Sequence, residues 1–215
     1  DRRRENKAAL QREAKLPEEP DVPLLGIISR LNDTKGFDIL GETIDHILDL
    51  GVQVVLMGTG EQHYHDLFGR MVEQYPQQVS IFLTFNTPLG QRIYAGSDML
   101  LMPSRVEPCG TNQLVALRYG CVPVVRATGG LADTVKDYDP RTGEGNGFVF
   151  HSYDRWQLFA AVVRAVETYK HRDAWEQLQR RGMAADHSWH RSAVEYVDLY
   201  RRAIVSRTPR AALEK

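Results

Sequence analysis

The chain has 215 residues, of which 42% are hydrophobic and 26% charged, and its formal net charge is −1. This length is enough for one domain with a full core, and the composition is ordinary for a globular protein. A nearly neutral chain has no general attraction to nucleic acid or to membranes, so we expect neither as a partner. Two cysteines exclude a disulfide scaffold, and no apolar run approaches the ~20 residues of a membrane span.

The first part of the chain predicts a helix or linker over residues 1–21, followed by a regular series of strands. Residues 1–16 are charged with few apolar positions, which predicts a surface helix or a tail that ends at Pro17. Short continuous apolar runs between helical patterns are typical of buried parallel strands. The runs are Leu24–Ile28, Val52–Met57, Val79–Leu83, Met99–Met102, Val122–Val125 and Phe148–Phe150.

The segments between these runs have helical periodicity. Phe37 to Leu48 has one apolar face, and the last two helices are expected around Ala174–Met183 and Ser192–Val205. Thr87 and Ser152 are placed to cap helices at their N-termini. Strands that alternate with helices predict an α/β fold with a doubly wound, mostly parallel, Rossmann-like sheet. We assign this domain to residues 22–204 and a tail to residues 205–215.

Chemically distinctive residues follow the predicted strands, where ligands of such sheets bind. In strand order they are Arg30 and Lys35, Gly58 and Gly60, Phe85, Glu107, and Thr128 to Gly130. Because the carboxyl ends of parallel strands share one edge, we expect all of these residues at that edge.

The segment from Ser104 to Val135 is the most informative part of the chain. A strand is followed by the carboxylate of Glu107, and a helix is expected to begin at Gly110 and Thr111. The N-terminus of a helix has free N–H groups and the positive end of a dipole, which suit phosphate. A nearby carboxylate suits sugar hydroxyls, so the pattern predicts a nucleotide-sugar pocket.

Two motifs resemble glycosyltransferase family 5, the bacterial glycogen synthases and plant starch synthases. The first is SRLNDTKGFDIL, Ser29 to Leu40. The second comprises Glu107-Pro108-Cys109-Gly110, Asn112-Gln113-Leu114, Arg118-Tyr119-Gly120 and Thr128-Gly129-Gly130-Leu131. They occur in the family's order, and the resemblance extends over residues 5 to 204. Val115 stands where related family 4 transferases have a second Glu, which favours family 5.

The resemblance implies roles for individual residues. Arg30 and Lys35 would clamp the donor diphosphate, Glu107 would orient the transferred glucose, and Phe85 would stack on adenine. Backbone groups of the helix start and of the third signature would approach the donor. These residues are Cys109, Gly110, Thr111, Asn112, Thr128, Gly129 and Gly130. Gly58 and Gly60, a GxG turn after a strand, are donor-binding candidates from their position at the same sheet edge. Thr111 departs from the family, which usually has Leu there.

Each assignment has a structural alternative. Arg30 and Lys35 would also suit a solvated loop, Glu107 a helix cap, and Phe85 the core. The glycines could simply turn the chain, and Cys109 would suit a small, semi-buried position rather than a nucleophile. We expect Trp156, Trp175 and Trp189 to anchor packing. The histidine pairs His63/His65 and His187/His190 lack a metal-site pattern, so no metal and no cofactor are expected.

The same resemblance implies the GT-B architecture, in which two Rossmann-like domains face each other. No Lys-x-Gly-Gly loop of the N-terminal domain occurs here, so we expect the C-terminal, donor-binding half. The whole enzyme would transfer glucose, with retention, from ADP-glucose to the non-reducing end of an α-1,4-glucan. It would lie in the bacterial cytoplasm, or in the plastid stroma if the source is a plant.

Two alternatives remain open at this point. One is a GT-B epimerase or family 4 transferase that uses a UDP- or GDP-sugar. The other is a nucleotide-binding module that is inactive without its missing N-terminal domain.

Overall fold

The computed structural model describes residues 2–207, and the statements below concern that part of the chain. It divides into two units, Asp1–Ala184 and Ala185–Lys215, which are considered separately. Residues 208–215 of the predicted tail lie outside the described residues, whereas 205–207 continue the last helix. No helix among the described residues is long and apolar enough to cross a membrane.

The first unit is built on a single parallel sheet with the strand order β3-β2-β1-β4-β5-β6. The strands are β1 (Leu24–Ile28), β2 (Gln53–Met57), β3 (Val79–Phe82), β4 (Met99–Met102), β5 (Val122–Arg126) and β6 (Phe148–Phe150). Every neighbouring pair is parallel, which confirms the predicted doubly wound α/β fold. The order reverses between β1 and β4, so the chain leaves these two strands in opposite directions and opens a crevice between them.

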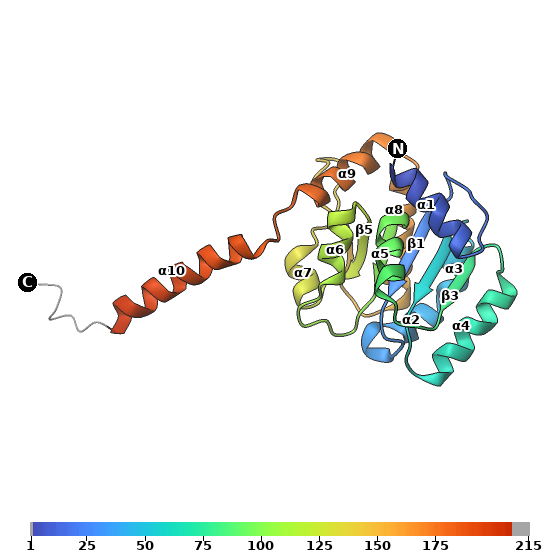
Figure 1. Ribbon diagram of the computed structural model, residues 1–215, viewed down its shortest axis with the longest axis horizontal. Helices are drawn as coiled ribbons and strands as arrows, with labels where there is room; N and C mark the ends of the chain where they lie inside the picture. Colours follow the sequence, from blue (N-terminus) through green and yellow to red (C-terminus); the bar gives the residue numbers. More distant parts are fainter. Residues whose placement is uncertain (1, 208–215) are drawn as a thin grey trace, which may run out of the picture. The chain divides into compact units, whose positions relative to one another are not determined.

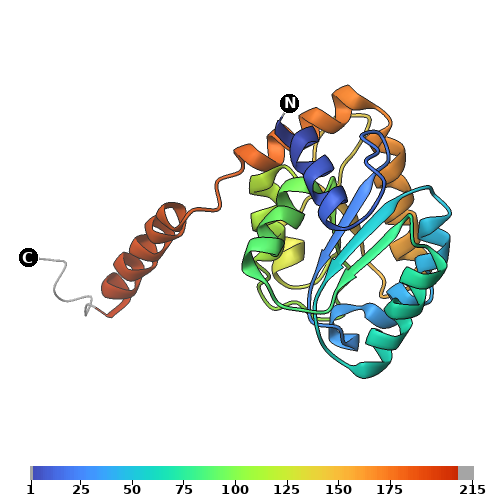
Figure 2. The ribbon, with the colours of Figure 1, turned by 45° about the vertical axis from the view of Figure 1, so that its right-hand side comes forward.

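Helices cover both faces of this sheet (Figures 1 and 2). One face carries α1 (Arg2–Glu13), α5 (Thr87–Gly96), α6 (Asn112–Tyr119) and α7 (Gly130–Thr134). The other carries α2 (Phe37–Gly41), α3 (Ile44–Leu48), α4 (Gln62–Gln74), α8 (Arg155–Tyr169) and part of α9 (Arg172–Ala184). Two apolar clusters, one on each face, make the core, as expected for strands that are apolar on both sides.

Several local predictions need correction. The segment from Phe37 to Leu48 is two short helices rather than one, because Thr43, with φ −129°, leaves the helical conformation between them. Asn86, not Thr87, caps α5 by accepting from the N–H of Leu89. Asp154, not Ser152, caps α8, since its carboxylate reaches two N–H groups of the first turn.

Tryptophan packing is also only partly as expected. Trp175 is 2% exposed and stacks on Phe148, so it is a packing anchor. Trp156 and Trp189 are 48% and 79% exposed, so they are not. Trp189 begins α10 (Trp189–Arg207), a helix of the second unit that buries none of its residues.

Helix α1 is neither a tail nor a purely surface helix, because it places a buried charge against the sheet. Lys7, 3% exposed, lies 2.7 Å from Asp98 Oδ2 and also donates to the carbonyl of Pro20 and the hydroxyl of Tyr169. Asp98 also accepts from the N–H of Leu24 at the start of β1. The pair therefore attaches α1 to the amino ends of β1 and β4.

We predict that Lys7→Met destabilises the chain by about 3–5 kcal/mol, because it leaves the Asp98 carboxylate buried without its cation. Chemical denaturation monitored by circular dichroism measures the change. Lys170→Met is the matched control, since it removes the lysine from the exposed ion pair with Glu167 and should change stability little. Equal effects of the two substitutions would contradict the assigned role of Lys7.

Candidate functional site

A hollow of about 360 Å³ lies at the carboxyl ends of β1 and β4, where the strand order reverses. Two adjoining hollows share its lining residues, and we call the three together the edge cleft. Among the lining residues are Arg30, Asn32, Lys35, Gly60, Phe85, Ser104, Glu107, Gly110, Thr111 and Asn112. Side chains that follow β1, β3 and β4 thus meet in one place. Gly58, Cys109 and Thr128 to Gly130 are not among the lining residues.

The centre of the edge cleft is an ion pair between Lys35 and Glu107. Lys35 Nζ lies 2.6 Å from Glu107 Oε2, and the two side chains are 26% and 11% exposed. Ser104 donates its hydroxyl to the same oxygen at 3.2 Å. Neither donor uses Oε1, and no other described residue donates to it, so this oxygen retains its full accepting capacity.

Glu107 does not cap α6. Thr111 is the N-cap of that helix, and its side chain makes no capping hydrogen bond. Among the described residues, no N–H from the first turn of α6 donates to Glu107, whose recorded donors are Lys35 and Ser104. The cap interpretation is therefore wrong, and the first turn of α6 presents N–H groups to the hollow that Lys35 and Glu107 also line.

The two loops that carry this pair are bound to each other. Lys35 ends a short 3₁₀ turn, Asp33–Lys35, which Asn32 caps through its side-chain oxygen. The N–H groups of Arg105 and Val106 both donate to the carbonyl of Thr34, at 3.0 and 3.2 Å. Lys35 and Glu107 are thus held in register by backbone hydrogen bonds between neighbouring residues.

A cluster of charged and aromatic side chains supports these loops from the side. The Arg105 guanidinium lies 2.6 Å from Asp38 and 4.5 Å from the ring centre of Tyr153, and Arg126 lies 5.5 Å from the same ring. Tyr153 donates its hydroxyl to Asp38. Burial alone would raise the pKa of Asp38, but the hydrogen bonds from Tyr153 and Arg105 outweigh it and hold the pKa below its usual value. Asp38 is therefore charged at neutral pH.

Arg30 and Phe85 lie at the mouth of the edge cleft. Arg30 is exposed, and its side chain has no ion pair or hydrogen bond among the described residues. Phe85 is 71% exposed and follows the end of β3 at Phe82 by three residues. The core interpretation of Phe85 is therefore wrong, because an aromatic ring left this far in solvent at a cleft is available to a ligand.

The start of α6 depends on the side chains of Asn112 and Gln113, which the sequence analysis placed in the second motif without assigning their hydrogen bonds. Asn112 donates from its side chain to the carbonyl of Ile28 at 3.0 Å, which joins α6 to the end of β1. Gln113, fully buried, donates to the carbonyl of Gly110 at 3.0 Å. Cys109 is exposed rather than semi-buried.

The glycines at positions 129 and 130 allow two loops to touch. Gly129 has φ +47°, and a Cβ there would lie 2.0 Å from the carbonyl oxygen of Glu107. The N–H of Gly130 donates to the carbonyl of Pro108 at 3.1 Å. A side chain at position 129 or 130 would collide with the loop that carries Glu107, so glycine is required at both positions.

Gly58 and Gly60 lie against the loop after β1, and a Cβ at either position would collide with the carbonyl of Ser29 or Leu31. Donor contacts by these residues remain a prediction.

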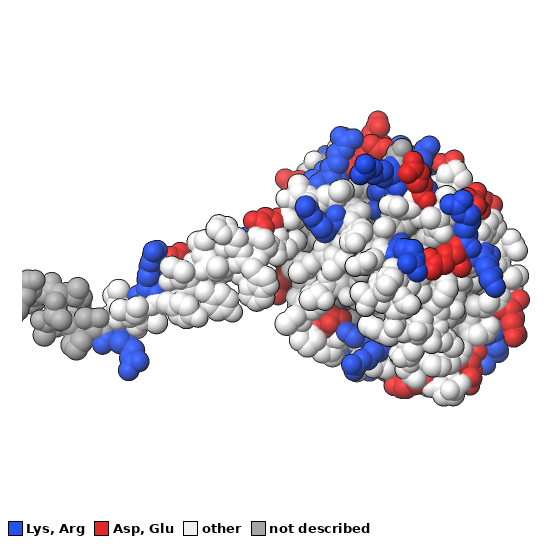
Figure 3. All heavy atoms as spheres, in the orientation of Figure 1, with Lys and Arg blue, Asp and Glu red and all other residues white. Residues whose placement is uncertain are grey.

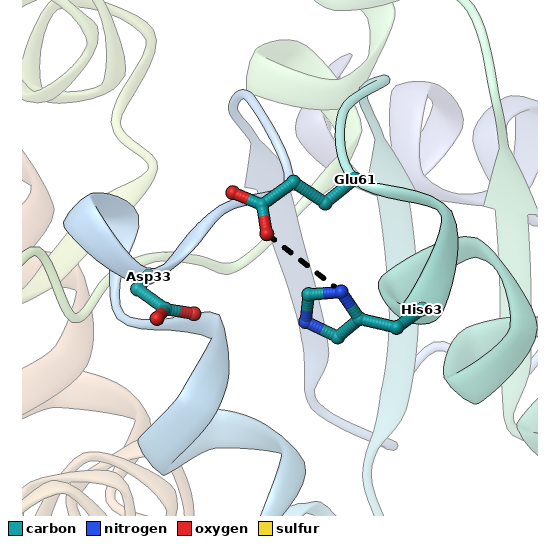
Figure 4. Close-up of side chains that lie close together, drawn as sticks. All are labelled: Asp33, Glu61 and His63. Atoms are coloured by element: carbon teal, nitrogen blue, oxygen red, sulfur yellow. Dashed lines mark ion pairs between the residues drawn. The ribbon is translucent and has the colours of Figure 1, made fainter.

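An acidic cluster beside the edge cleft was not foreseen. Asp33, Glu61 and His63 offer ligand atoms within 4.8 Å of one another, and His63 lies 3.7 Å from Glu61 (Figure 4). All three residues are exposed, and Asp33 also accepts a hydrogen bond from Tyr64. Burial and this bond raise the pKa of Tyr64. Exposed acids at this spacing do not by themselves make a metal site, so the expected absence of a metal remains a prediction.

Comparison with known proteins gives consistent relatives. The family described as glycosyl transferases group 1 matches residues 10–181. A glycogen synthase of Desulforudis audaxviator is 53% identical over 203 residues, which are 94% of this chain and 40% of that protein. A glycogen synthase of Fervidobacterium nodosum is 51% identical, again over 94% of this chain and 42% of that protein. The chain therefore spans less than half the length of these curated relatives.

Solved structures agree with the fold. The catalytic domain of starch synthase IV from Arabidopsis thaliana, bound to ADP and acarbose, matches with a TM-score of 0.86 and 37% identity, over 94% of this chain and 43% of that one. Sucrose-phosphate synthase from Thermosynechococcus elongatus matches with a TM-score of 0.66 and 20% identity, over 93% of this chain and 49% of that one. The second likeness concerns the fold alone.

We predict that Gly129→Ala destabilises the chain by clearly more than Gly143→Ala, as measured by chemical denaturation. Both glycines have positive φ, so both substitutions carry backbone strain of order 1–3 kcal/mol. A Cβ at Gly143 meets nothing within 4 Å, whereas one at Gly129 collides with the Glu107 carbonyl. An equal loss of stability in the two variants would show that the collision with the Glu107 loop contributes nothing beyond the backbone strain.

Proposed function

Because the chain belongs to the glycosyl transferases of group 1, we propose that it is the donor-binding half of a glycogen or starch synthase. The donor in this proposal is ADP-glucose, and the acceptor is the non-reducing end of an α-1,4-glucan. Relatives that are named glycogen synthase support the reaction. A structural neighbour of 37% identity that holds ADP supports the nucleotide.

The observation that carries the proposal is the Lys35–Glu107 pair in the edge cleft. An ammonium has three N–H donors, and Glu107 uses one of those on Lys35. The other two are available to a phosphate oxygen. Glu107 Oε1 is similarly available to a sugar hydroxyl. One ion pair thus offers a donor to the diphosphate and an acceptor to the sugar attached to it.

The remaining parts of the cleft suit the rest of a nucleotide sugar. The Arg30 guanidinium has no ion pair or hydrogen bond within residues 2–207, and it is able to bind a phosphate with two hydrogen bonds. The N–H groups at the start of α6 add the positive end of a helix dipole. Phe85 provides an exposed ring at the mouth of the cleft for the base.

In the proposed reaction the bond between the anomeric carbon and the diphosphate oxygen breaks, and negative charge grows on the departing ADP. Arg30, Lys35 and the start of α6 are preorganised where this charge would develop, which lowers the barrier. Glu107 would hold the sugar in position through Oε1. The acceptor would bind to the half of the enzyme that this chain lacks, so we propose that the chain alone binds nucleotide and has little turnover.

A second candidate is a transferase or epimerase that uses a UDP- or GDP-sugar. Arg30, Lys35 and the start of α6 would serve any nucleoside diphosphate equally well. Only the base of the donor nucleotide therefore distinguishes the two candidate functions. In our proposal the preference for adenine depends on Phe85 and the residues around it.

Calorimetric titration of this chain tests the nucleotide. We expect ADP to bind with a Kd of ~10–1000 μM, because one wall of the site is missing, and more tightly than UDP or GDP. Arg30→Ala should weaken ADP binding about tenfold or more, because the charge-assisted hydrogen bonds from the guanidinium to the phosphate are lost.

Arg70→Ala is the matched control, because Arg70 is an exposed arginine on α4 that does not line the edge cleft. It should leave ADP affinity unchanged. UDP binding as tight as ADP would refute the adenine assignment, and an equal effect of the two arginine variants would remove Arg30 from the site.

Glu107→Gln separates a role in the reaction from a role in folding. In the full-length enzyme we expect turnover with ADP-glucose to fall by about 10²-fold or more, because a contact with the sugar has been weakened. ADP affinity should be maintained or increased, since Lys35 then has no neutralising carboxylate. A lower melting temperature with unchanged kcat would instead indicate that Glu107 only orders the loop.

A further inference from the structure

A second cleft, of about 350 Å³, lies at the opposite edge of the sheet from the edge cleft. Its walls come from the first turns of α1, from one side of α9, and from Asp98 and Tyr169. Figure 1 shows the start of α1 and α9 at the top of the first unit, whereas α2 lies at the other end. We call this hollow the α1–α9 cleft.

The lining of the α1–α9 cleft is strongly basic. Five cations contribute to it, Arg3, Arg4, Lys7, Arg172 and Arg180, and only two carboxylates, Asp98 and Glu176. Figure 3 shows basic side chains gathered over α1 and α9, with a few acidic ones between them. An excess of fixed positive charge in a concave surface raises the local concentration of anions.

Both carboxylates already have a cation of their own. Asp98 is neutralised by Lys7 at 2.7 Å, and Glu176 lies 3.3 Å from Arg180. Among the described residues, Arg4 and Arg172 have no carboxylate partner. The only partner recorded for Arg172 is the hydroxyl of Tyr169, which is neutral.

The apolar wall of the cleft contains a second unmatched group. Trp175 lines the cleft and is 2% exposed, and its indole N–H has no acceptor among the described residues. The indole nitrogen is shielded from solvent, so we use the ring of Trp175 as a reporter of the cleft wall and not as a ligand contact. The excess of positive charge is the feature that indicates the ligand, an anion with several acceptor oxygens.

We propose that the α1–α9 cleft binds a phosphate monoester of a small sugar. Arg4 and Arg172 would hold the phosphate, because guanidinium groups match its oxygens in pairs. The cleft is in the size range of small-molecule sites, so it has room for a sugar as well as for the phosphate. This site is separate from the edge cleft and does not depend on the proposed transferase activity.

Nuclear magnetic resonance of the indole N–H groups tests this proposal directly. The chain has three tryptophans, and Trp156 and Trp189 are exposed, so Trp156→Phe and Trp189→Phe identify the signal of Trp175. Ribose 5-phosphate, added at constant ionic strength, should shift the Trp175 signal in a saturable way with a Kd below about 10 mM. Inorganic phosphate should bind more weakly, because it lacks the sugar.

Variants of Arg4 and Arg172, which have no carboxylate partner among the described residues, identify the site. The double variant Arg4→Gln, Arg172→Gln should weaken binding at least tenfold, whereas Arg70→Gln, an exposed arginine outside the cleft, should not. A saturating concentration of ADP should leave the titration unchanged. The proposal is overturned if Trp175 does not respond, if the double variant binds normally, or if ADP abolishes the effect.

Discussion

The reversal of strand order between β1 and β4 is the constraint on which the rest of the first unit depends. All six strands are parallel, so their following loops meet at one edge. The loops after β1 and β4 diverge to opposite faces, yet they remain tied by the two N–H groups that share the carbonyl of Thr34. These hydrogen bonds join the two loops, and Lys35 and Glu107 meet between them at 2.6 Å.

The sequence predicts the frame of this fold well, because the apolar runs are short and alternate with longer segments of helical periodicity, which favours buried parallel strands over buried helices. It predicts helix ends less well where two residues compete for the same cap. Asn86 and Asp154, rather than Thr87 and Ser152, stand at the last extended residue before each helix, from which their side chains accept from the free N–H groups of the first turn. The break at Thr43 has only weak local signals, Gly41 and the β-branched Thr43, both poor helix formers that the apolar periodicity of the segment outweighs in the prediction.

The sequence also predicts which residues lie near the site but not how they are paired. Lys35 and Glu107 lie on two loops that are distant in the chain, so their contact is not visible in the sequence. The same holds for the fact that Lys35 and Ser104 both donate to Oε2 of Glu107 and leave its Oε1 unused. The same limit explains why the contact of Gly129 with the Glu107 carbonyl and the cluster of Asp33, Glu61 and His63 were not foreseen. Periodicity and motifs predict which residues lie at the carboxyl edge of the sheet. Contacts between the loops can be read only from the three-dimensional course of the backbone.

Helix α6 connects the two ends of the first unit. Its first turn opens on the edge cleft, while the carbonyl of its last residue, Tyr119, accepts from Arg3 and that of Gly120 accepts from Gln179. Arg3 and Gln179 both line the α1–α9 cleft. A cation at the C-terminus of a helix and an anion at its N-terminus both stabilise its dipole. The same eight-residue helix therefore presents free N–H groups at one cleft, and at the other its last carbonyl accepts from the cation of Arg3, which favours the same orientation of the helix dipole.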